Sequence, residues 1–139
     1  MKTIDAPMLK RILDTLVPSS DRDFTVEIVA GRHRRRRIAA QYRVIDKSIK
    51  TYGEFHPLTI VALGVHELAH HVARKRGYGG HGKGFIDTLD KLVRLFNLGY
   101  AESMKMDLNF DKRQPSTKML FFIKREKTEH HGNIRVERG

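Results

Sequence analysis

PLTIVALGVHELAHHVARKR, residues 57–76, is the longest helical segment that the sequence predicts. Its apolar residues recur at helical spacing, and smaller apolar residues beside them widen the stripe, so we expect a helix buried at the centre of the domain. Pro57 suits the first helical position, and Gly77 suits the C-terminal cap. The basic residues 74–76 suit the negative end of the helix dipole. The main apolar stripe consists of Leu58, Val61, Val65, Leu68 and Val72.

Helical periodicity and strand-like alternation predict the elements on either side of this helix. The further predicted helices are 7–17 and 85–96, and the predicted strands are 24–29, 38–45, 48–52, 119–123 and 134–137. Helix, strands, two helices and then strands is an order typical of an α+β domain. We therefore expect a small sheet packed against the buried helix.

The composition indicates one globular domain. The length of 139 residues is enough to bury a core and too short for two domains. With 40% hydrophobic and 31% charged residues, the composition is that of a globular protein. We divide the single domain 1–139 into a basic strand and loop region at 24–52, a motif region at 57–98 and a C-terminal strand region at 118–139. The sequence has no cysteine, which excludes disulfides, thiolate metal sites and a cysteine nucleophile. Any transition-metal site must therefore use imidazole and carboxylate.

Residues 66–70 read His-Glu-Leu-Ala-His, an H-E-x-x-H motif on the central helix. Residues four apart on a helix lie on nearly the same face, so His66 and His70 are placed to chelate one Zn²⁺ ion. Glu67 lies about 100° round the helix, from where its carboxylate reaches a water on the metal. The competing interpretation is a histidine-rich helix face with ordinary hydrogen bonds. The apolar surroundings favour the metal site, because unpaired imidazoles would be costly there.

A catalytic zinc site needs a third protein ligand and an open position. His81 follows in a glycine-rich turn that can fold back on the helix, and we favour it. Asp87 or Asp90 would serve as the third ligand from the helix that follows this turn, and Glu102 would serve from a later helix. His71 is rotated about 100° from the metal face, so we expect it at the helix surface or the edge of the core.

The segments His66-Glu67-Leu68-Ala69-His70 and Gly80-His81-Gly82-Lys83-Gly84-Phe85 together resemble the SprT-like zinc metallopeptidases. The resemblance covers roughly residues 57–98 and implies a small zincin-like domain, in which a second helix carries on from the turn with the third ligand. It implies His66, His70 and His81 as zinc ligands and Glu67 as the general base. It also implies that Phe85 packs the second helix against the first.

Members of this family act on proteins that are bound or crosslinked to DNA. The resemblance therefore implies such a protein as the substrate. The cysteine zinc ribbon of many bacterial relatives cannot form in a chain without cysteine. The spacing differs from that of metzincins, whose third histidine would stand where this chain has Arg76. Small three-histidine endoribonucleases use a shorter second spacing and lack the glutamate within the motif.

The positive charge predicts an anionic partner. Lys and Arg number 27 against 16 Asp and Glu, a net charge of +11, which favours DNA or a nucleoprotein as partner. The arginines concentrate in one run, which we interpret as a phosphate-binding surface rather than a solvated loop. Lys124, Arg125 and Lys127 would extend it. The run consists of Arg32, Arg34, Arg35, Arg36 and Arg37.

The sequence thus predicts a zinc-dependent metalloprotease, a hydrolase that cleaves DNA-associated proteins. A nucleic-acid-binding module with a structural or inactive zinc site, and a zinc-dependent nuclease, are the alternatives. We expect it to be cytoplasmic, because no signal peptide or transmembrane segment is apparent. The segment 48–52 is expected to pair with an extended substrate, and Arg76, Tyr78 and Tyr100 are candidates for stabilising the transition state.

Overall fold

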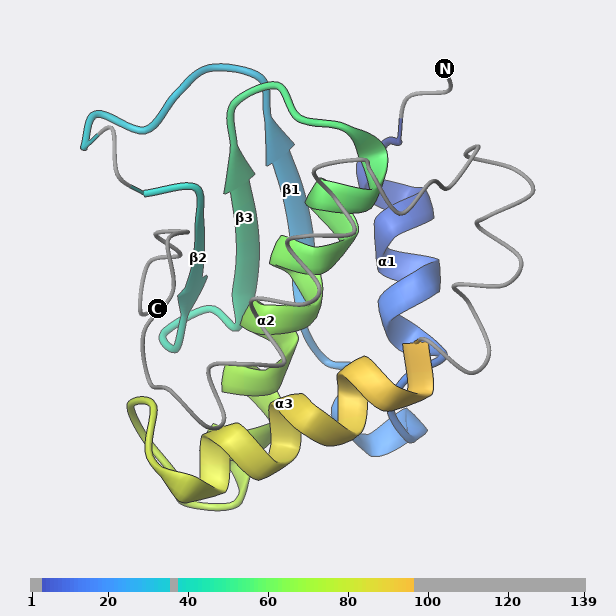
Figure 1. The fold of residues 1–139 in the computed structure, drawn as a ribbon, viewed down its shortest axis with the longest axis vertical. Coiled ribbons are helices and arrows are strands. Elements are labelled where there is room, and N and C mark those ends of the chain that lie inside the picture. Colours follow the sequence, from blue (N-terminus) through green and yellow to red (C-terminus); the bar gives the residue numbers. More distant parts are fainter. Residues whose placement is uncertain (1–3, 36–37, 97–139) are drawn as a thin grey trace.

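The computed structural model describes residues 4–35 and 38–96, which form three α-helices and a three-stranded sheet (Figure 1). The predicted α+β architecture is confirmed. The predicted strands at 119–123 and 134–137 lie outside the described residues. The helices are α1 (Ala6–Asp14), α2 (Pro57–Lys75) and α3 (Lys83–Leu95), and the strands are β1 (Thr25–Val29), β2 (Ala40–Arg43) and β3 (Ser48–Tyr52). A single 3₁₀ turn, η1 (Ser19–Asp21), connects α1 to β1.

The sheet has the order β1-β3-β2, with β1 parallel and β2 antiparallel to β3. Both edges of β3 are therefore paired, from Ser48 with Thr25 to Tyr52 with Val29 on one side. The expectation that segment 48–52 pairs with a substrate was wrong for this reason. Within the part of the chain that the structure describes, the outer edge of β2 pairs with no strand.

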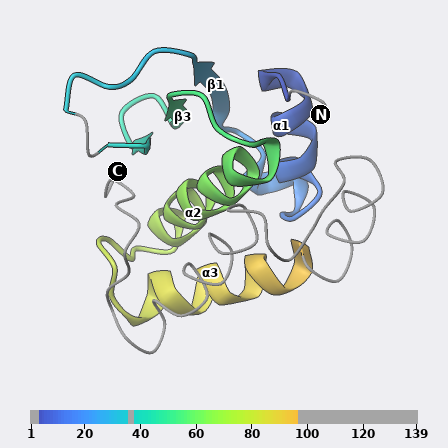
Figure 2. The ribbon, with the colours of Figure 1, turned by 45° about the horizontal axis from the view of Figure 1, so that its top comes forward.

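Helix α2 lies between the sheet and α3, as Figure 2 shows. Every residue from Pro57 to Ala73 is buried, because the sheet, α1 and α3 cover different sides of the helix. The breadth of the apolar stripe in this segment therefore has a direct structural cause. Among residues 4–35 and 38–96, no helix combines the length and the apolar character that crossing a membrane requires.

Both predicted ends of α2 are confirmed. His56 is the N-cap, and its Nδ1 accepts a hydrogen bond from the Leu58 N–H at 3.1 Å. At the other end Gly77 adopts φ of +87°, which suits a residue without a Cβ. The Gly77 N–H donates to the Arg74 carbonyl at 3.0 Å, and the Tyr78 N–H donates to the Ala73 carbonyl at 2.9 Å.

Strand β2 is shorter than the predicted strand 38–45. The chain turns after Arg43 to bring β3 alongside, and Lys47 takes a positive φ of 53° within this turn. Ser48 Oγ donates to the Asp46 carboxylate at 2.7 Å, which stabilises the turn. Ile45 is 91% exposed as a result, although its sequence pattern matches that of a strand.

Helices α1 and α2 approach closely at Gly64. A Cβ added there would lie 3.2 Å from Leu9 Cδ1 and 3.3 Å from Leu13 Cδ1. Both leucines are fully buried, so neither can move away into solvent. The absence of a side chain at this position sets the distance between the two helices.

We predict that Gly64→Val destabilises the protein by about 1–3 kcal/mol, because its methyl groups overpack the contact with α1. The measurement is the free energy of unfolding in urea. Gly31→Val is the matched control, since a Cβ at Gly31 meets nothing within 4 Å. Equal unfolding free energies for the two variants would contradict the close approach of α1 and α2.

Candidate metal centre

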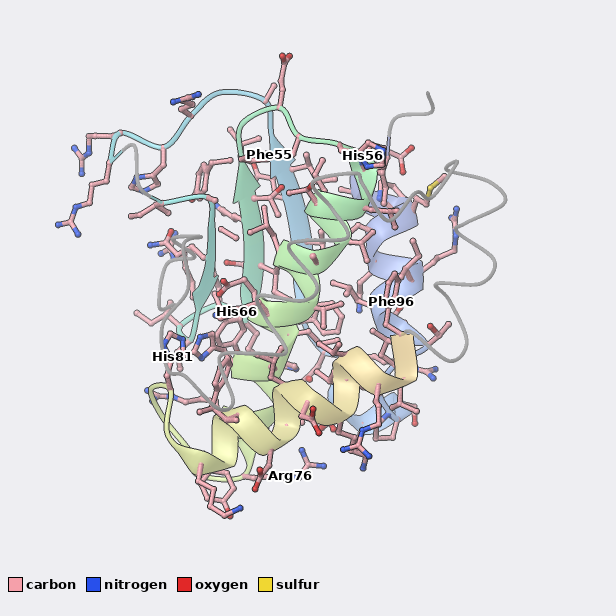
Figure 3. All side chains as sticks on the ribbon, viewed as in Figure 1. Phe55, His56, His66, Arg76, His81 and Phe96 are labelled. Carbon is pink, nitrogen blue, oxygen red and sulfur yellow. The ribbon has the colours of Figure 1, made fainter. Side chains whose placement is uncertain are left out.

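Three histidine rings converge where the end of α2 meets the turn before α3. The ring centroids of His66 and His70 lie 5.2 Å apart, and that of His81 lies 5.3 and 4.8 Å from them respectively. His70 Nε2 and His81 Nε2 are 3.0 Å apart. One ligand nitrogen from each ring lies within 4.8 Å of the others. Figure 3 shows His66 and His81 close to each other, on α2 and on the turn.

The turn that carries His81 is shaped by glycines. Gly77 ends α2, and Gly80 immediately before His81 adopts φ of +64°, again in the left-handed region. Gly82 then caps α3, its carbonyl accepting from the Ile86 N–H at 3.0 Å. The chain therefore reverses direction within a few residues and places the His81 ring against α2.

Phe85 of α3 packs on all three imidazoles. Its ring stacks on His70 at a centroid distance of 4.2 Å and an angle of 24°. The distances to His66 and His81 are 5.1 and 4.7 Å. Phe85 is fully buried, so it forms an apolar wall behind the histidine nitrogens. This contact joins α3 to α2 directly at the site.

The three rings fit a metal ion. Tetrahedral coordination with Zn–N bonds of about 2.05 Å separates neighbouring nitrogens by about 3.3 Å. The observed 3.0 Å between His70 and His81, with all three ligand atoms within 4.8 Å, requires only small side-chain rotations to reach it. Imidazole nitrogen is a donor that suits divalent transition metals such as zinc, copper and nickel. The three histidines could therefore hold one such ion.

Exposure increases across the three ligands. His66 is fully buried, His70 is 6% exposed and His81 is half-buried. Glu67, adjacent to His66, is also fully buried. An ion held by these rings is thus open to solvent from the side of His81 and enclosed on the side of His66.

The other predicted third ligands lie elsewhere. Asp87 forms an ion pair with Lys83 at 2.6 Å, and Asp90 forms one with Arg94. Neither aspartate belongs to the histidine group. Glu102 lies outside the described residues. Among the candidates that the structure describes, His81 alone joins His66 and His70.

The predicted transition-state residues are only partly described. Arg76 lies 3.8 Å from the Asp21 carboxylate, and Figure 3 shows it away from His66 and His81. Tyr78 is 51% exposed and its ring covers Gly84, where an added Cβ would collide with the ring. Tyr78 thus stays on the turn that carries His81, whereas Arg76 does not reach the site. Tyr100 lies outside the described residues.

His71 is fully buried, which corrects the expectation of a surface or core-edge position. Its Nε2 faces two acceptors, the Asp21 carbonyl at 3.1 Å and Asp23 Oδ1 at 3.0 Å. Because Nε2 must donate to them, a neutral His71 accepts at Nδ1, where the Tyr42 hydroxyl lies at 2.8 Å. The chain Tyr42–His71–Asp23 therefore links β2 through α2 to the segment before β1.

The ionisation of these groups agrees with this assignment. Burial lowers the pKa of His71 and favours the neutral ring. Burial, with the nearby charge of Asp23, raises the pKa of Tyr42 to about 12, so its hydroxyl keeps the proton that it donates. Hydrogen bonds from Lys47 and Lys75 hold the pKa of Asp23 well below its usual range. Asp23 therefore stays ionised and accepts from His71 and both lysines.

The described part of the basic run is exposed. Arg32, Arg34 and Arg35 all lie at the surface, and none forms an ion pair with another described residue. Arg36 and Arg37, together with Lys124, Arg125 and Lys127, lie outside the described residues. As far as the described residues go, these three guanidinium groups are therefore available to an anion.

Comparisons with known proteins find no relative. No protein-family model, no curated protein and no solved structure matches this chain. The metal centre is therefore interpreted from its own geometry.

We predict that Tyr42→Phe destabilises the protein by about 1–3 kcal/mol, because it leaves His71 Nδ1 as a buried acceptor without its donor. Urea unfolding measures the loss. Tyr52→Phe is the matched control, because the Tyr52 hydroxyl donates to Gln41 Oε1 at 3.2 Å in a partly exposed pair that water can replace. A loss as small as that of Tyr52→Phe would show that the buried chain contributes nothing.

We predict that His81→Ala lowers zinc affinity by more than about 100-fold, since loss of even an indirect partner of a ligand costs about 10–100-fold. The measurement is bound zinc per chain after equilibration with a chelator of known affinity. The control is His33→Ala, which removes a histidine from the loop between β1 and β2, outside the histidine group, and should keep wild-type zinc content. Unchanged zinc in His81→Ala would exclude His81 as a ligand and favour Glu102.

Proposed function

We propose that this chain is a zinc-dependent metallopeptidase of the SprT-like kind, acting on proteins associated with or crosslinked to DNA. The observation that carries the proposal is the convergence of His66, His70 and His81 beside a glutamate on the same helix. Three protein nitrogens leave one tetrahedral position for water or substrate, as in catalytic zinc sites. Structural zinc sites instead use four protein ligands.

Zinc is the metal that this donor set supports best. The ligands are imidazoles, and the chain has no cysteine that would favour a thiolate-bound metal. Zinc accepts a tetrahedral site with one open position and has no redox chemistry of its own. When bound, zinc polarises the scissile carbonyl and lowers the pKa of water towards about 7.

Glu67 is the general base in this proposal. It follows His66 on a helix whose sides are all covered, so its carboxylate acts in surroundings of low dielectric constant. We assign to Glu67 the removal of a proton from the attacking water and its delivery to the leaving amine. Phe85 is fully buried and stacks on His70, so it shields that face of the imidazole from solvent.

Strand β2 offers the substrate a place to bind. It packs against α2, and its outer edge has no partner strand within the described residues. An extended polypeptide can add to such an edge through backbone hydrogen bonds, which do not depend on its sequence. Low sequence selectivity is what a peptidase for many DNA-bound proteins needs.

The positive charge supports the DNA part of the proposal. The net charge is +11, and Arg32, Arg34 and Arg35 are exposed and form no ion pair with another described residue. Arginine binds phosphate through its planar fork and reads no sequence from it. The charge would bring the peptidase to its substrates, and the histidine cluster would carry out the reaction.

We predict that Glu67→Gln keeps zinc but lowers the rate of proteolysis by about 10²–10⁴-fold, since the amide cannot accept the proton. Zinc content and cleavage of a basic DNA-binding protein are measured on the same preparation. Lys91→Gln, a surface change on α3, is the control and should cleave at the wild-type rate. Cleavage by Glu67→Gln at the wild-type rate would exclude the mechanism.

The same assay, run with and without DNA, separates the competing functions. Cleavage of the protein supports the peptidase. DNA binding with neither polymer cleaved would favour a binding module with a structural or inactive metal site. Degradation of the nucleic acid would favour a zinc-dependent nuclease.

A further inference from the structure

A pocket of about 490 Å³ lies at the end of the sheet where β1 and β3 finish. One wall is the basic loop, which we define as the described residues 30–35 and 38–39 between β1 and β2. The other wall is the connection from β3 to α2, with Tyr52, Glu54 and Phe55. Arg32 of the basic loop also lines the pocket.

The basic loop is held in place against β3. The Tyr52 N–H donates to the Ala39 carbonyl at 2.8 Å. The His33 ring packs edge-on against Tyr52 at 4.8 Å between centroids, and His33 Nδ1 accepts from the Arg35 N–H at 2.9 Å. The described arginines of this loop, Arg32, Arg34 and Arg35, therefore lie on a segment that these contacts hold against β3.

Phe55 is the unusual member of the pocket. Its side chain is 40% exposed, although most phenylalanines of the described chain are buried in the core. A Cβ added to Gly53 would lie 3.2 Å from Phe55 Cε2, so the ring lies over the bare backbone of Gly53. Gly53 has φ of +102°, a conformation that favours glycine. The Phe55 ring is therefore held against Gly53, partly exposed, in the pocket that Arg32 also lines.

A ligand for this pocket needs a flat apolar face and a negative charge a short distance away. A nucleotide has both, and aromatic side chains with arginines are the common means of binding unpaired bases. In a duplex the faces of the bases are covered by their neighbours, so only a single strand offers them. We propose that this pocket binds single-stranded nucleic acid, with a base stacked on Phe55 and a phosphate at Arg32.

The pocket and the metal centre are well separated. Figure 3 shows Phe55 at the end of the molecule away from His66 and His81. From His56 to His66 the helix rises about 15 Å at 1.5 Å per residue. A strand held at Phe55 therefore leaves the histidine cluster uncovered. The proposal refines the DNA association of the proposed function and does not depend on peptidase chemistry.

The test is fluorescence anisotropy with a labelled oligothymidylate of about 15 nucleotides and with a duplex of equal length. The full zinc-loaded chain should bind the single strand more tightly at equal salt. Phe55→Ala should weaken single-strand binding by about tenfold and leave duplex binding unchanged, because only the single strand stacks on the ring. Phe55→Trp should restore the affinity.

Arg32→Ala tests the phosphate contact. It should weaken binding of both nucleic acids and reduce the slope of log affinity against log salt by about 1. Arg11→Ala removes the same charge from α1, and Ile45→Ala removes an apolar side chain that is 91% exposed. Both controls should bind the single strand within about twofold of wild type.

The proposal is overturned if Phe55→Ala binds the single strand as tightly as wild type does. It is also overturned if Phe55→Ala and Phe55→Trp both lose affinity for the duplex, and by equal factors. Binding of a basic or neutral peptide in place of the oligonucleotide would equally overturn it. Because the experiment measures binding and not proteolysis, it can support the binding proposal even if the chain has no peptidase activity. Conversely, a failed binding test leaves the result for Glu67→Gln unaffected.

Discussion

The buried hydrogen-bond chain from Tyr42 through His71 to Asp23 holds α2 in one rotation against the sheet. A helix packed only by apolar contacts can rotate by small amounts at little cost, because such contacts have no direction. The His71 ring lacks this freedom, since each of its nitrogens has a partner on a different segment. His70, the next residue, is thereby directed about 100° round the helix from His71, towards His81.

Helix α2 consequently has one part of its surface that packs against the sheet and another that carries the candidate metal ligands. Apolar residues and His71 face the sheet and α1, whereas His66 and His70 face α3 and the turn that precedes it. Lys75 strengthens the same support near the end of the helix, donating to Asp23 at 2.9 Å and to the Ser20 carbonyl at 2.6 Å. The side that holds the ligands also packs against α3, where Phe85 contacts His66 and His70.

Features that depend on neighbouring residues were predicted well from the sequence. The limits of α2 followed from Pro57 and Gly77, and the approach of His81 followed from the glycines around it, because both are matters of local backbone geometry. The order of the strands is not local, so the central position of β3 could not be read from its own residues. His71 illustrates the same limit: its adjacency to His70 showed that it faces away from the ligands, but not that Tyr42 and Asp23 meet it there.

The position of all three candidate ligands within residues 66–81 affects folding as well as metal binding. Closing so short a segment costs little chain entropy, so an ion can join α2 to the start of α3 without waiting for the sheet to form. Metal binding that requires α2 and α3 to be folded against each other stabilises this pair of helices. The stabilising free energy grows with the logarithm of the ratio of metal concentration to dissociation constant. The supply of metal would then determine how long α2 and α3 stay packed together before they unfold locally, in addition to whether the site holds an ion.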